Sequence, residues 1–422
     1  MDDKNTGDFG WIDELVRDVR GDVSIYQLVS PENEVREKDR FENHLRDQLA
    51  RQIPSDEQKV REAVSEISMD EITASELESL DLREPDFRYE SPDNYDMHRN
   101  KIQEARKTLE STETSDQIKN LYIATLEECE ALIDIAENLG DPETVQEASQ
   151  EIYGRPSDEA LEWAEETLRE IEVSCKGEEK FSPAEMKSTL EAAVEELGME
   201  DWTVVYTNKG VVSVNGANRE IRVPEKDRMY TENEIARLPI HEVGTHALRN
   251  ANGYHQDFEI LGAGAARYHS TGEGLALFME EETGLSNEQL KRKYAGRALA
   301  IQSVLDGEEF TDTYKMAREH DFSHERAWNI ATRAHRAGGF IKDHIYAEGL
   351  QEVSDYVEEE GSIDDLLIGK ISSEYSGLAD EGLAARYSPA DLVREIDGIV
   401  PDHVDTADID TNGLDEHVSS PA

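Results

Sequence analysis

The sequence predicts a mostly helical α+β protein in which one small antiparallel sheet precedes a helix that carries two histidines. Three observations support this fold class. Apolar residues recur at helical spacing along most of the 422 residues. Short β-branched runs are confined to residues 202–224. The helix that follows these runs contains His-Glu-Val-Gly-Thr-His at residues 241–246.

Residues 1–93 are predicted to form an acidic segment that is helical or mobile. A turn at Pro31-Glu32-Asn33 precedes a helix through Phe41, and residues 50–85 are highly charged with only a thin apolar pattern. Residues 85–89, Pro-Asp-Phe-Arg-Tyr, are expected to be extended and to dock on the body through their aromatic side chains. We therefore place the start of the main domain at residue 94.

The main domain is predicted to span residues 94–400. It opens with a helical pattern over residues 94–138, and two further helices follow after Ser157 and Ser182, both of which fit helix starts. Beyond the domain, residues 401–422 lack a hydrophobic pattern and are predicted to be disordered.

The sheet is expected in the middle of this domain. Three β-branched runs, separated by turns rich in Asn and Gly, lie at residues 202–207, 211–214 and 220–224. This pattern predicts a three-stranded antiparallel meander. A Thr-x-x-Glu capping box at residues 231–234 then opens the helix that carries His241, and the chain is mostly helical from there to about residue 397.

The charge of the chain excludes one class of partner. With 96 acidic and 43 basic residues, the formal net charge is −53, so the chain is not expected to bind a nucleic-acid backbone by general charge. An acidic surface for a cationic partner is one interpretation. Because the acids are spread along the whole chain, we favour a halophilic organism with a salt-rich cytoplasm, in which surface carboxylates keep the protein hydrated and salt screens their repulsion.

Other features favour a cytoplasmic protein. Cys129 and Cys175 form neither a CxxC motif nor a disulfide framework, which indicates a reducing compartment. The N-terminus has no basic-then-apolar signal peptide, and no stretch approaches the ~20 apolar residues of a membrane span. We therefore expect no membrane partner.

His241, His246 and Glu273 are the predicted ligands of a catalytic zinc ion. Zinc in proteins binds imidazole nitrogen and carboxylate oxygen, and a catalytic site uses three protein ligands and leaves one position for water. Glu242, which follows the first histidine directly, is the predicted general base that takes a proton from that water.

The two histidines are one residue further apart than in the familiar zinc helix His-Glu-x-x-His. On a regular α-helix, residues five apart point ~140° away from each other, so His241 and His246 would not share an ion. They would then be ordinary histidines on different faces. A widened turn of the π type at residues 242–246 would instead bring the rings together, and Gly244 would tolerate that distortion. The sequence thus predicts a wide turn here.

The third ligand has alternatives nearby in the sequence, namely His255, Asp257 and His269. Glu273 is favoured because it lies in the first turn of an apolar helix, where a buried carboxylate needs a cation. The competing interpretation is a glutamate that the helix dipole favours at a helix start.

A second group of cations lies between residues 324 and 344. Arg333, Arg336 and Lys342 are candidates to bind a substrate carboxylate, since arginine can clamp a carboxylate through two hydrogen bonds. The alternative is a set of ion pairs with the acidic body of the protein. Tyr346 is a candidate proton donor or oxyanion partner, although it also fits a buried tyrosine whose hydroxyl is hydrogen-bonded.

Several motifs resemble the QEGLA-motif family. Its bacterial members are called flavohaemoglobin-expression-modulating proteins, and its animal members include the microtubule-associated tyrosine carboxypeptidase, which removes the C-terminal tyrosine of α-tubulin. The resemblance rests on residues 241–253, which begin His-Glu-Val-Gly-Thr-His, and on Thr-Gly-Glu-Gly-Leu-Ala at 271–276. It continues at residues 153–156, 336–346 and 369–371 and spans most of residues 25–395, with an apparent acidic insertion at 46–84.

The resemblance implies a zincin-like metallopeptidase fold. It supports His241, His246 and Glu273 as zinc ligands and Glu242 as the base. The glutamine that usually precedes the metal-binding glutamate of the family is Gly272 in this chain. The implied function is that of a zinc-dependent carboxypeptidase, whose substrate is the C-terminus of a peptide or protein. Tubulin itself is not expected as the substrate, because the composition is that of a halophilic prokaryote.

Two other functions remain open at this point. The first is another zinc hydrolase, such as an endopeptidase or an amide hydrolase. A site closed on one side would favour exopeptidase action, whereas an open groove would favour endopeptidase action. The second is a regulatory protein with a structural zinc ion, in which His255 or His269 would close the coordination shell as a fourth ligand.

Overall fold

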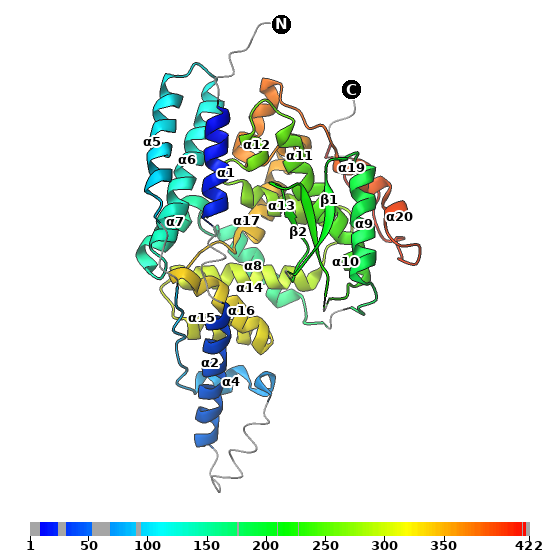
Figure 1. Ribbon diagram of the computed structural model, residues 1–422. Helices are drawn as coiled ribbons and strands as arrows, with labels where there is room; N and C mark the ends of the chain where they lie inside the picture. Colours follow the sequence, from blue (N-terminus) through cyan, green and yellow to red (C-terminus); the bar gives the residue numbers. More distant parts are fainter. Residues whose placement is uncertain are drawn as a thin grey trace.

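Helices make up most of the chain, as the sequence predicts (Figure 1). The computed structural model describes residues 9–23, 31–52, 68–89, 94–174, 177–208, 210–226, 228–415 and 417–418. Within these ranges, no helix has the length and apolar character needed to cross a membrane.

The first group of helices surrounds the N-terminal helix. It comprises α1 (Gly10–Asp22), α5 (Asp96–Ser111), α6 (Asp116–Glu137), α7 (Pro142–Tyr153) and the single turn α12 (Ile260–Ala263). α1 buries Ile12, Leu15 and Val19 at helical spacing and packs against α5, α6 and α12 (Figure 1). α1 thus shares its core with residues from the second half of the chain, such as Ile260 and Phe340.

A second group of helices packs around Phe41. It comprises α2 (Pro31–Gln52), η2 (Met69–Glu71), α4 (Ala74–Glu78), α8 (Asp158–Glu170), α14 (Glu288–Leu305), α15 (Phe310–Glu319) and α16 (His324–His335). The short η4 (Arg336–Gly338) follows α16 and packs on α7 of the first group. Phe87 meets Phe310 with ring centroids 5.9 Å apart, so the predicted docking of residues 85–89 through an aromatic side chain is confirmed. Residues 53–67, within the predicted acidic excursion at 50–85, lie outside the described residues.

The sheet differs from the predicted antiparallel meander. β1 (Thr203–Thr207), β2 (Ser213–Asn215) and β3 (Glu220–Pro224) lie in the order β1-β3-β2, with β1 parallel and β2 antiparallel to β3. The prediction of a purely antiparallel sheet is therefore wrong. β3 takes the centre because it carries the buried Ile221 and Val223, whereas β2 is short and largely polar.

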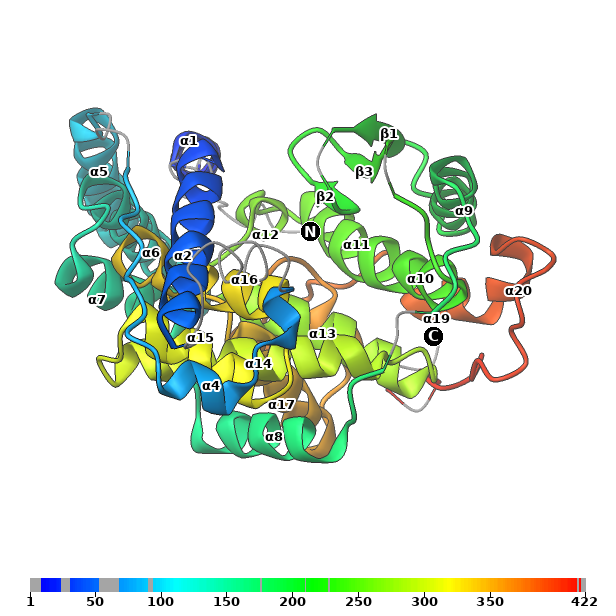
Figure 2. The ribbon, with the colours of Figure 1, turned by 90° about the horizontal axis from the view of Figure 1, so that it is seen from below.

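The third group contains the histidine-bearing stretch. It comprises α9 (Pro183–Glu196), α10 (Glu232–Leu238), η3 (Pro239–Ala247), α11 (Leu248–Tyr254), α13 (Tyr268–Glu282), α17 (Ile345–Glu358), α18 (Ile363–Leu366), η5 (Ser373–Glu381), α19 (Pro389–Arg394) and α20 (Ile396–Ile399). Seen from below, the sheet and α9 lie on one side of the α10–α11 run, and α13, α14, α17 and α8 follow on the other (Figure 2).

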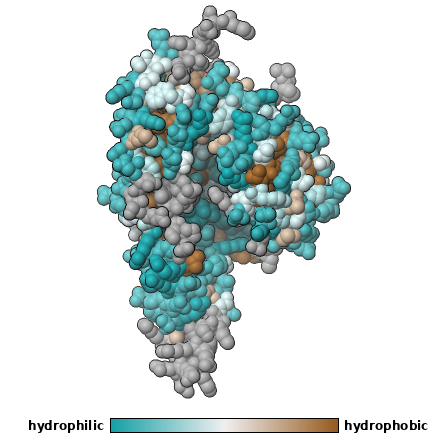
Figure 3. Space-filling model, viewed as in Figure 1, coloured by the Kyte–Doolittle hydropathy of each residue, from teal (hydrophilic) through white to brown (hydrophobic). Residues whose placement is uncertain are grey.

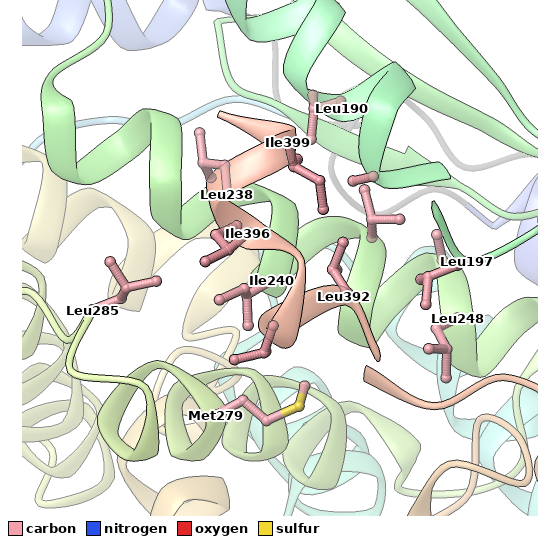
Figure 4. Close-up of a cluster of buried hydrophobic side chains, with 14 of the residues drawn as sticks. Leu190, Leu197, Leu238, Ile240, Leu248, Met279, Leu285, Leu392, Ile396 and Ile399 are labelled. Atoms are coloured by element: carbon pink, nitrogen blue, oxygen red, sulfur yellow. The ribbon is translucent and has the colours of Figure 1, made fainter. Parts of the chain in front are cut away.

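A hydrophobic cluster holds η3 between these layers. Leu190 of α9, Leu238 of α10, Met279 of α13 and Leu392 of α19 converge around Ile240 (Figure 4). Because interiors are packed to a density close to that of organic crystals, a stretch enclosed on several sides holds its side chains in defined positions. The core thus fixes the part of the chain that carries the histidines.

The C-terminal segment is packed on the body, contrary to the predicted disorder of residues 401–422. Leu414 is buried, and His417 lies against Phe278 with ring centroids 5.1 Å apart and forms an ion pair with Glu282 at 3.0 Å. The prediction failed because this segment contributes isolated apolar residues from turns, which leave no periodicity in the sequence. Residues 416 and 419–422 lie outside the described ranges.

The visible surface reflects the acidic composition. Most of the face in Figure 3 is hydrophilic, and a group of apolar side chains is visible over the region of the sheet.

Candidate metal centre

The two histidines lie on a π-helical stretch. η3 (Pro239–Ala247) joins α10 directly to α11 and has hydrogen bonds between residues five apart. Within it, the Thr245 hydroxyl also donates to the carbonyl oxygen of Ile240, five residues earlier, at 3.2 Å. The predicted wide turn at 242–246 is therefore confirmed, and it extends over nine residues.

Gly244 serves close packing in this turn. Its backbone does not adopt a positive φ. A Cβ atom at this position would stand 3.2 Å from Cδ2 of Leu392 in α19, which is tighter than ordinary contact. The glycine thus lets α19 approach the π-helix, a role that sequence reasoning based on backbone tolerance did not anticipate.

The wide turn brings the two imidazoles to one point, where α13 adds a carboxylate. The rings of His241 and His246 have centroids 5.0 Å apart and an interplanar angle of 72°. Nε2 of His246 lies 3.8 Å from Oε2 of Glu273. One ligand atom from each of the three residues lies within 4.8 Å of the other two. The structure thus brings together all three predicted ligands.

This donor set fits a zinc ion. Two imidazoles and one carboxylate are ligands that zinc binds in catalytic sites, and bonds of ~2.1 Å in a tetrahedral shell place ligand atoms ~3.4 Å apart. The separations here, 3.8 Å and at most 4.8 Å, exceed that value by little enough for small side-chain rotations to close the shell.

Glu280 orients the first histidine and was missed in the sequence. Its Oε1 accepts a hydrogen bond from Nδ1 of His241 at 2.7 Å and one from Nη1 of Arg237 at 2.6 Å. A carboxylate on the far nitrogen fixes the tautomer of a metal-binding histidine and raises its basicity. The available signal was spacing, because Glu280 follows Glu273 by seven residues and so lies on the same face of α13.

Burial sets the protonation of these groups. It raises the pKa of Glu242 to about 7 and lowers the pKa of His246 well below its usual range, which keeps that imidazole neutral. Burial also lowers the pKa of His241, but the hydrogen bond and charge of Glu280 outweigh it and raise that pKa. Glu242 is therefore suited to exchange a proton near neutral pH.

The other histidines and Asp257 do not join the three ligands. Among the described residues, no fourth His, Cys, Asp or Glu belongs to the cluster. His255 is exposed, with Nδ1 2.7 Å from the carbonyl oxygen of Ala251, and Asp257 is exposed as well. His269 lies against Tyr268, with ring centroids 4.0 Å apart.

Two of the predicted substrate-binding residues are engaged elsewhere. Arg333 binds both carboxylate oxygens of Asp343, one of them at 2.8 Å. Arg336 lies over the Phe340 ring at 5.4 Å, and its charge acts on the carboxyl of Glu34 in α2. The pair of Arg333 with Asp343 matches the alternative interpretation of this cluster, in which the cations form ion pairs within the protein.

Lys342 and Tyr346 lie closer to the metal centre. The charge of Lys342 acts on the carboxyl of Glu273, and its ammonium lies over the Tyr153 ring at 5.5 Å. Burial, and after it the charge of Glu273, raises the pKa of Tyr346 well above its usual value. The Tyr346 ring is stacked on Tyr294 with centroids 4.2 Å apart.

Two further cations of α14 reach the same place and were missed. The charges of Lys293 and Arg297 act on the carboxyl of Glu273. They are four residues apart and thus share a helix face. That spacing was visible in the sequence, but the tertiary packing of α14, which contacts α8, α15, α16 and α17, was not.

Arg249 explains why Gly272 stands where the family usually has a glutamine. Its buried guanidinium donates from Nε to the carbonyl oxygens of Leu366 at 3.1 Å and Gly369 at 3.0 Å. A Cβ atom at Gly272 would stand 2.7 Å from Nη1 of Arg249. The glycine therefore accommodates this arginine directly beside Glu273, the predicted metal ligand.

Comparison with known proteins gives one family. The model of the microtubule-associated tyrosine carboxypeptidase family matches residues 77–385. Among solved structures, one of a lipoprotein of unknown function from Shewanella oneidensis aligns with 13% identity over 76% of each chain and a TM-score of 0.38, which is too low to support an argument. The comparison with curated proteins finds no match.

Proposed function

Because this chain belongs to the microtubule-associated tyrosine carboxypeptidase family, we propose that it is a zinc-dependent carboxypeptidase with a zincin-like active site. The observation that carries the proposal is the wide turn that brings His241 and His246 together with Glu273, directly beside the buried Glu242. The substrate would be the C-terminus of a peptide or protein, in keeping with the tyrosine carboxypeptidase for which the family is named.

The chain's own residues divide the chemistry. His241, His246 and Glu273 would hold the ion. When bound, zinc supplies a Lewis acid for the scissile carbonyl and lowers the pKa of a water molecule. Glu242 would take a proton from the attacking water on its carboxylate and pass it to the leaving amine.

Hydrolysis is favoured over a structural role for the metal. A structural zinc site is closed by four protein ligands, whereas a catalytic one keeps a position for water. Within the described part of the chain, only three candidate ligands cluster, and the base candidate stands next to them. The cations that act on Glu273 favour an anionic substrate group near the ion, which supports exopeptidase action over endopeptidase action.

The proposal is tested with a set of peptides that carry each natural residue at the C-terminus. The purified, zinc-loaded protein is incubated with them in low-salt and in high-salt buffer, and the products are identified by mass spectrometry. We expect release of single C-terminal residues, and loss of that release in Glu242→Gln. Cleavage at internal bonds would contradict the carboxypeptidase and favour an endopeptidase. No cleavage of any peptide would contradict hydrolysis.

A further inference from the structure

The helix that carries Glu273 begins in a sequence that does not favour a helix. α13 starts at Tyr268 and continues His-Ser-Thr-Gly-Glu-Gly, so glycines flank Glu273 and a serine and a β-branched threonine precede it. Glycine is the weakest helix former after proline, and serine and threonine are also weaker than alanine. Arg267, at the N-cap, provides no side-chain cap and has a left-handed backbone with φ of 57°. The start of α13 therefore depends on contacts from outside the helix.

Two side chains of α6 hold the backbone directly before α13. The N–H of Arg267 donates to Oε2 of Glu128 at 2.9 Å, and the N–H of Ala266 donates to Oγ1 of Thr125 at 3.0 Å. Both acceptor side chains are buried. A carboxylate is also favoured at this place by the positive end of the helix dipole. The N-terminus of α13 is thus fixed by another helix.

Arg20 of α1 holds the same stretch of backbone through its carbonyl groups. The guanidinium donates to the three successive carbonyl oxygens of residues 263–265, at 3.4 Å for the first and 3.3 Å for the last. It also donates to Oε1 of Glu128 at 2.8 Å, so a single carboxylate joins Arg20 to the N–H of Arg267. The two charged side chains are only 14% and 4% exposed. Arg20, Glu128 and Thr125 thus form a clamp, which we call the α13 clamp, on the residues that lead into this helix.

The α13 clamp lies close to Glu273 along the helix. Glu273 follows Arg267 by six residues, which is ~9 Å at 1.5 Å per residue. Beyond Glu273, α13 is fixed at Gly274 by its close approach to Gly349 of α17, whereas the turn before Glu273 depends on the clamp. The three predicted ligand atoms lie within 4.8 Å of one another, and a tetrahedral zinc shell needs ~3.4 Å. Unwinding of this first turn would therefore move Glu273 out of reach of an ion on the two histidines.

We infer that Arg20 is a positioning residue of the metal centre, which holds the start of α13 so that Glu273 meets His241 and His246. α1, which carries Arg20, lies outside residues 77–385, the part of the chain that matches the family model. The inference rests on the proposed zinc-dependent function, to which it adds an N-terminal helix that helps to assemble the site.

The test uses variants of the full chain that separate positioning from general stability. Arg20→Met removes the guanidinium and keeps an unbranched side chain. Arg20→Lys keeps the charge but not the planar fork of donors, and it carries the test if Arg20→Met does not fold. Arg17→Met is the matched control, since this arginine of the same helix forms an exposed ion pair with Glu259 at 2.6 Å. Val145→Ala weakens the same hydrophobic cluster from α7 and leaves the α13 clamp intact.

Three quantities are measured on each protein. Zinc dissociation constants are obtained by competition with a chromogenic chelator, stability by urea unfolding, and hydrogen–deuterium exchange over residues 263–276 by mass spectrometry of the metal-free protein. We expect zinc binding to be roughly 10-fold weaker in Arg20→Met, as it would be if the helix start were formed in about a tenth of the molecules, with faster exchange over residues 263–276. Arg20→Lys should lose part of the zinc affinity. Arg17→Met should match the wild-type protein, and Val145→Ala should lose stability but keep its zinc affinity.

Two results would overturn the inference and leave the metal centre standing. One is wild-type zinc affinity and wild-type exchange in Arg20→Met. The other is an equal loss of zinc affinity in Val145→Ala, because Arg20 would then act through general stability alone. Absence of zinc binding in the wild-type protein would instead contradict the proposed function together with the inference.

Discussion

Glu280 and His241 are joined by a hydrogen bond of 2.7 Å from Nδ1 of the imidazole to Oε1 of the carboxylate. The same carboxylate pairs with Arg237, and both partners are buried, so the charge and position of Glu280 are fixed. The bond leaves Nε2 of His241 as the nitrogen available to an ion. The centre is therefore oriented by a second carboxylate from α13, the helix that also supplies Glu273.

The first prediction concerns this second carboxylate. Glu280→Gln keeps the shape of the side chain but removes the charge that orients the imidazole, so zinc affinity should fall by roughly 10-fold to 100-fold. Affinity is measured by competition with a chromogenic chelator. Glu281→Gln is the control, because the neighbouring Glu281 pairs with Lys291 at the surface. Equal zinc affinity in the two variants would show that Glu280 does not support the site.

A second prediction follows from the close approach of α13 and α17. A Cβ atom at Gly274 would stand 1.9 Å from the carbonyl oxygen of Gly349, so Gly274→Ala must push the two helices apart. We expect a loss of about 1–3 kcal/mol or more in the free energy of unfolding, measured by urea denaturation. Gly398→Ala is the matched control, since nothing lies within 4 Å of its Cβ position. If Gly274→Ala were as stable as the wild-type protein, this close packing of α13 and α17 would be contradicted.

The third prediction concerns Asp343, a carboxylate that is 2% exposed and holds Arg333 and Arg297. Asp343→Ala leaves these arginines without their buried partner, and we expect a loss of about 3–5 kcal/mol in the free energy of unfolding. Asp397→Ala, at an exposed aspartate, should change it by less than about 0.5 kcal/mol. Thermal and urea unfolding of both variants measure the difference, and a similar stability of the two would count against the ion-pair cluster.

The fourth prediction uses the pH dependence of stability. Burial raises the pKa of Asp13 from 3.8 to about 6, while its carboxylate accepts a hydrogen bond from the Tyr122 hydroxyl at 2.7 Å. Between these two pKa values the folded chain binds a proton that the unfolded chain does not. The contribution of protonated Asp13 to the free energy of unfolding is therefore fully present below pH 3.8 and is lost as the pH rises through about 6.

Asp13→Asn has no such titration. The wild-type protein should lose up to about 3 kcal/mol relative to this variant between acidic and neutral pH, since each pKa unit corresponds to about 1.4 kcal/mol. Urea unfolding of both proteins at several pH values and one fixed high salt concentration measures the difference. A difference that does not change with pH would mean that Asp13 keeps an ordinary pKa in the folded protein.

The sequence predicted the parts of the site that are encoded locally. His241, Glu242 and His246 lie within six residues, and the extra residue between the histidines required the wide turn that the structure contains. Glu280 was within reach of the same reasoning, because it follows Glu273 by two helical turns.

Features that depend on tertiary packing were not predictable in this way. The charge of Lys293 acts on Glu273 only through the tertiary placement of α14. The ion pair of Arg333 with Asp343 joins α16 to the residues just before α17. The order of the strands also depends on tertiary packing, because the most buried strand, β3, lies at the centre of the sheet. The packing of Leu414 comes from a segment without periodicity.

The most direct test of the central claim is the zinc content of the purified protein. After removal of metal with a chelator, reloading and desalting, elemental analysis should find one zinc ion per chain in the wild-type protein and in Glu242→Gln. It should find almost none in His246→Gln and in Glu273→Gln, provided that circular dichroism shows both to be folded. Full zinc content in the two ligand variants, or none in the wild-type protein, would contradict the assignment of His241, His246 and Glu273 as a metal centre.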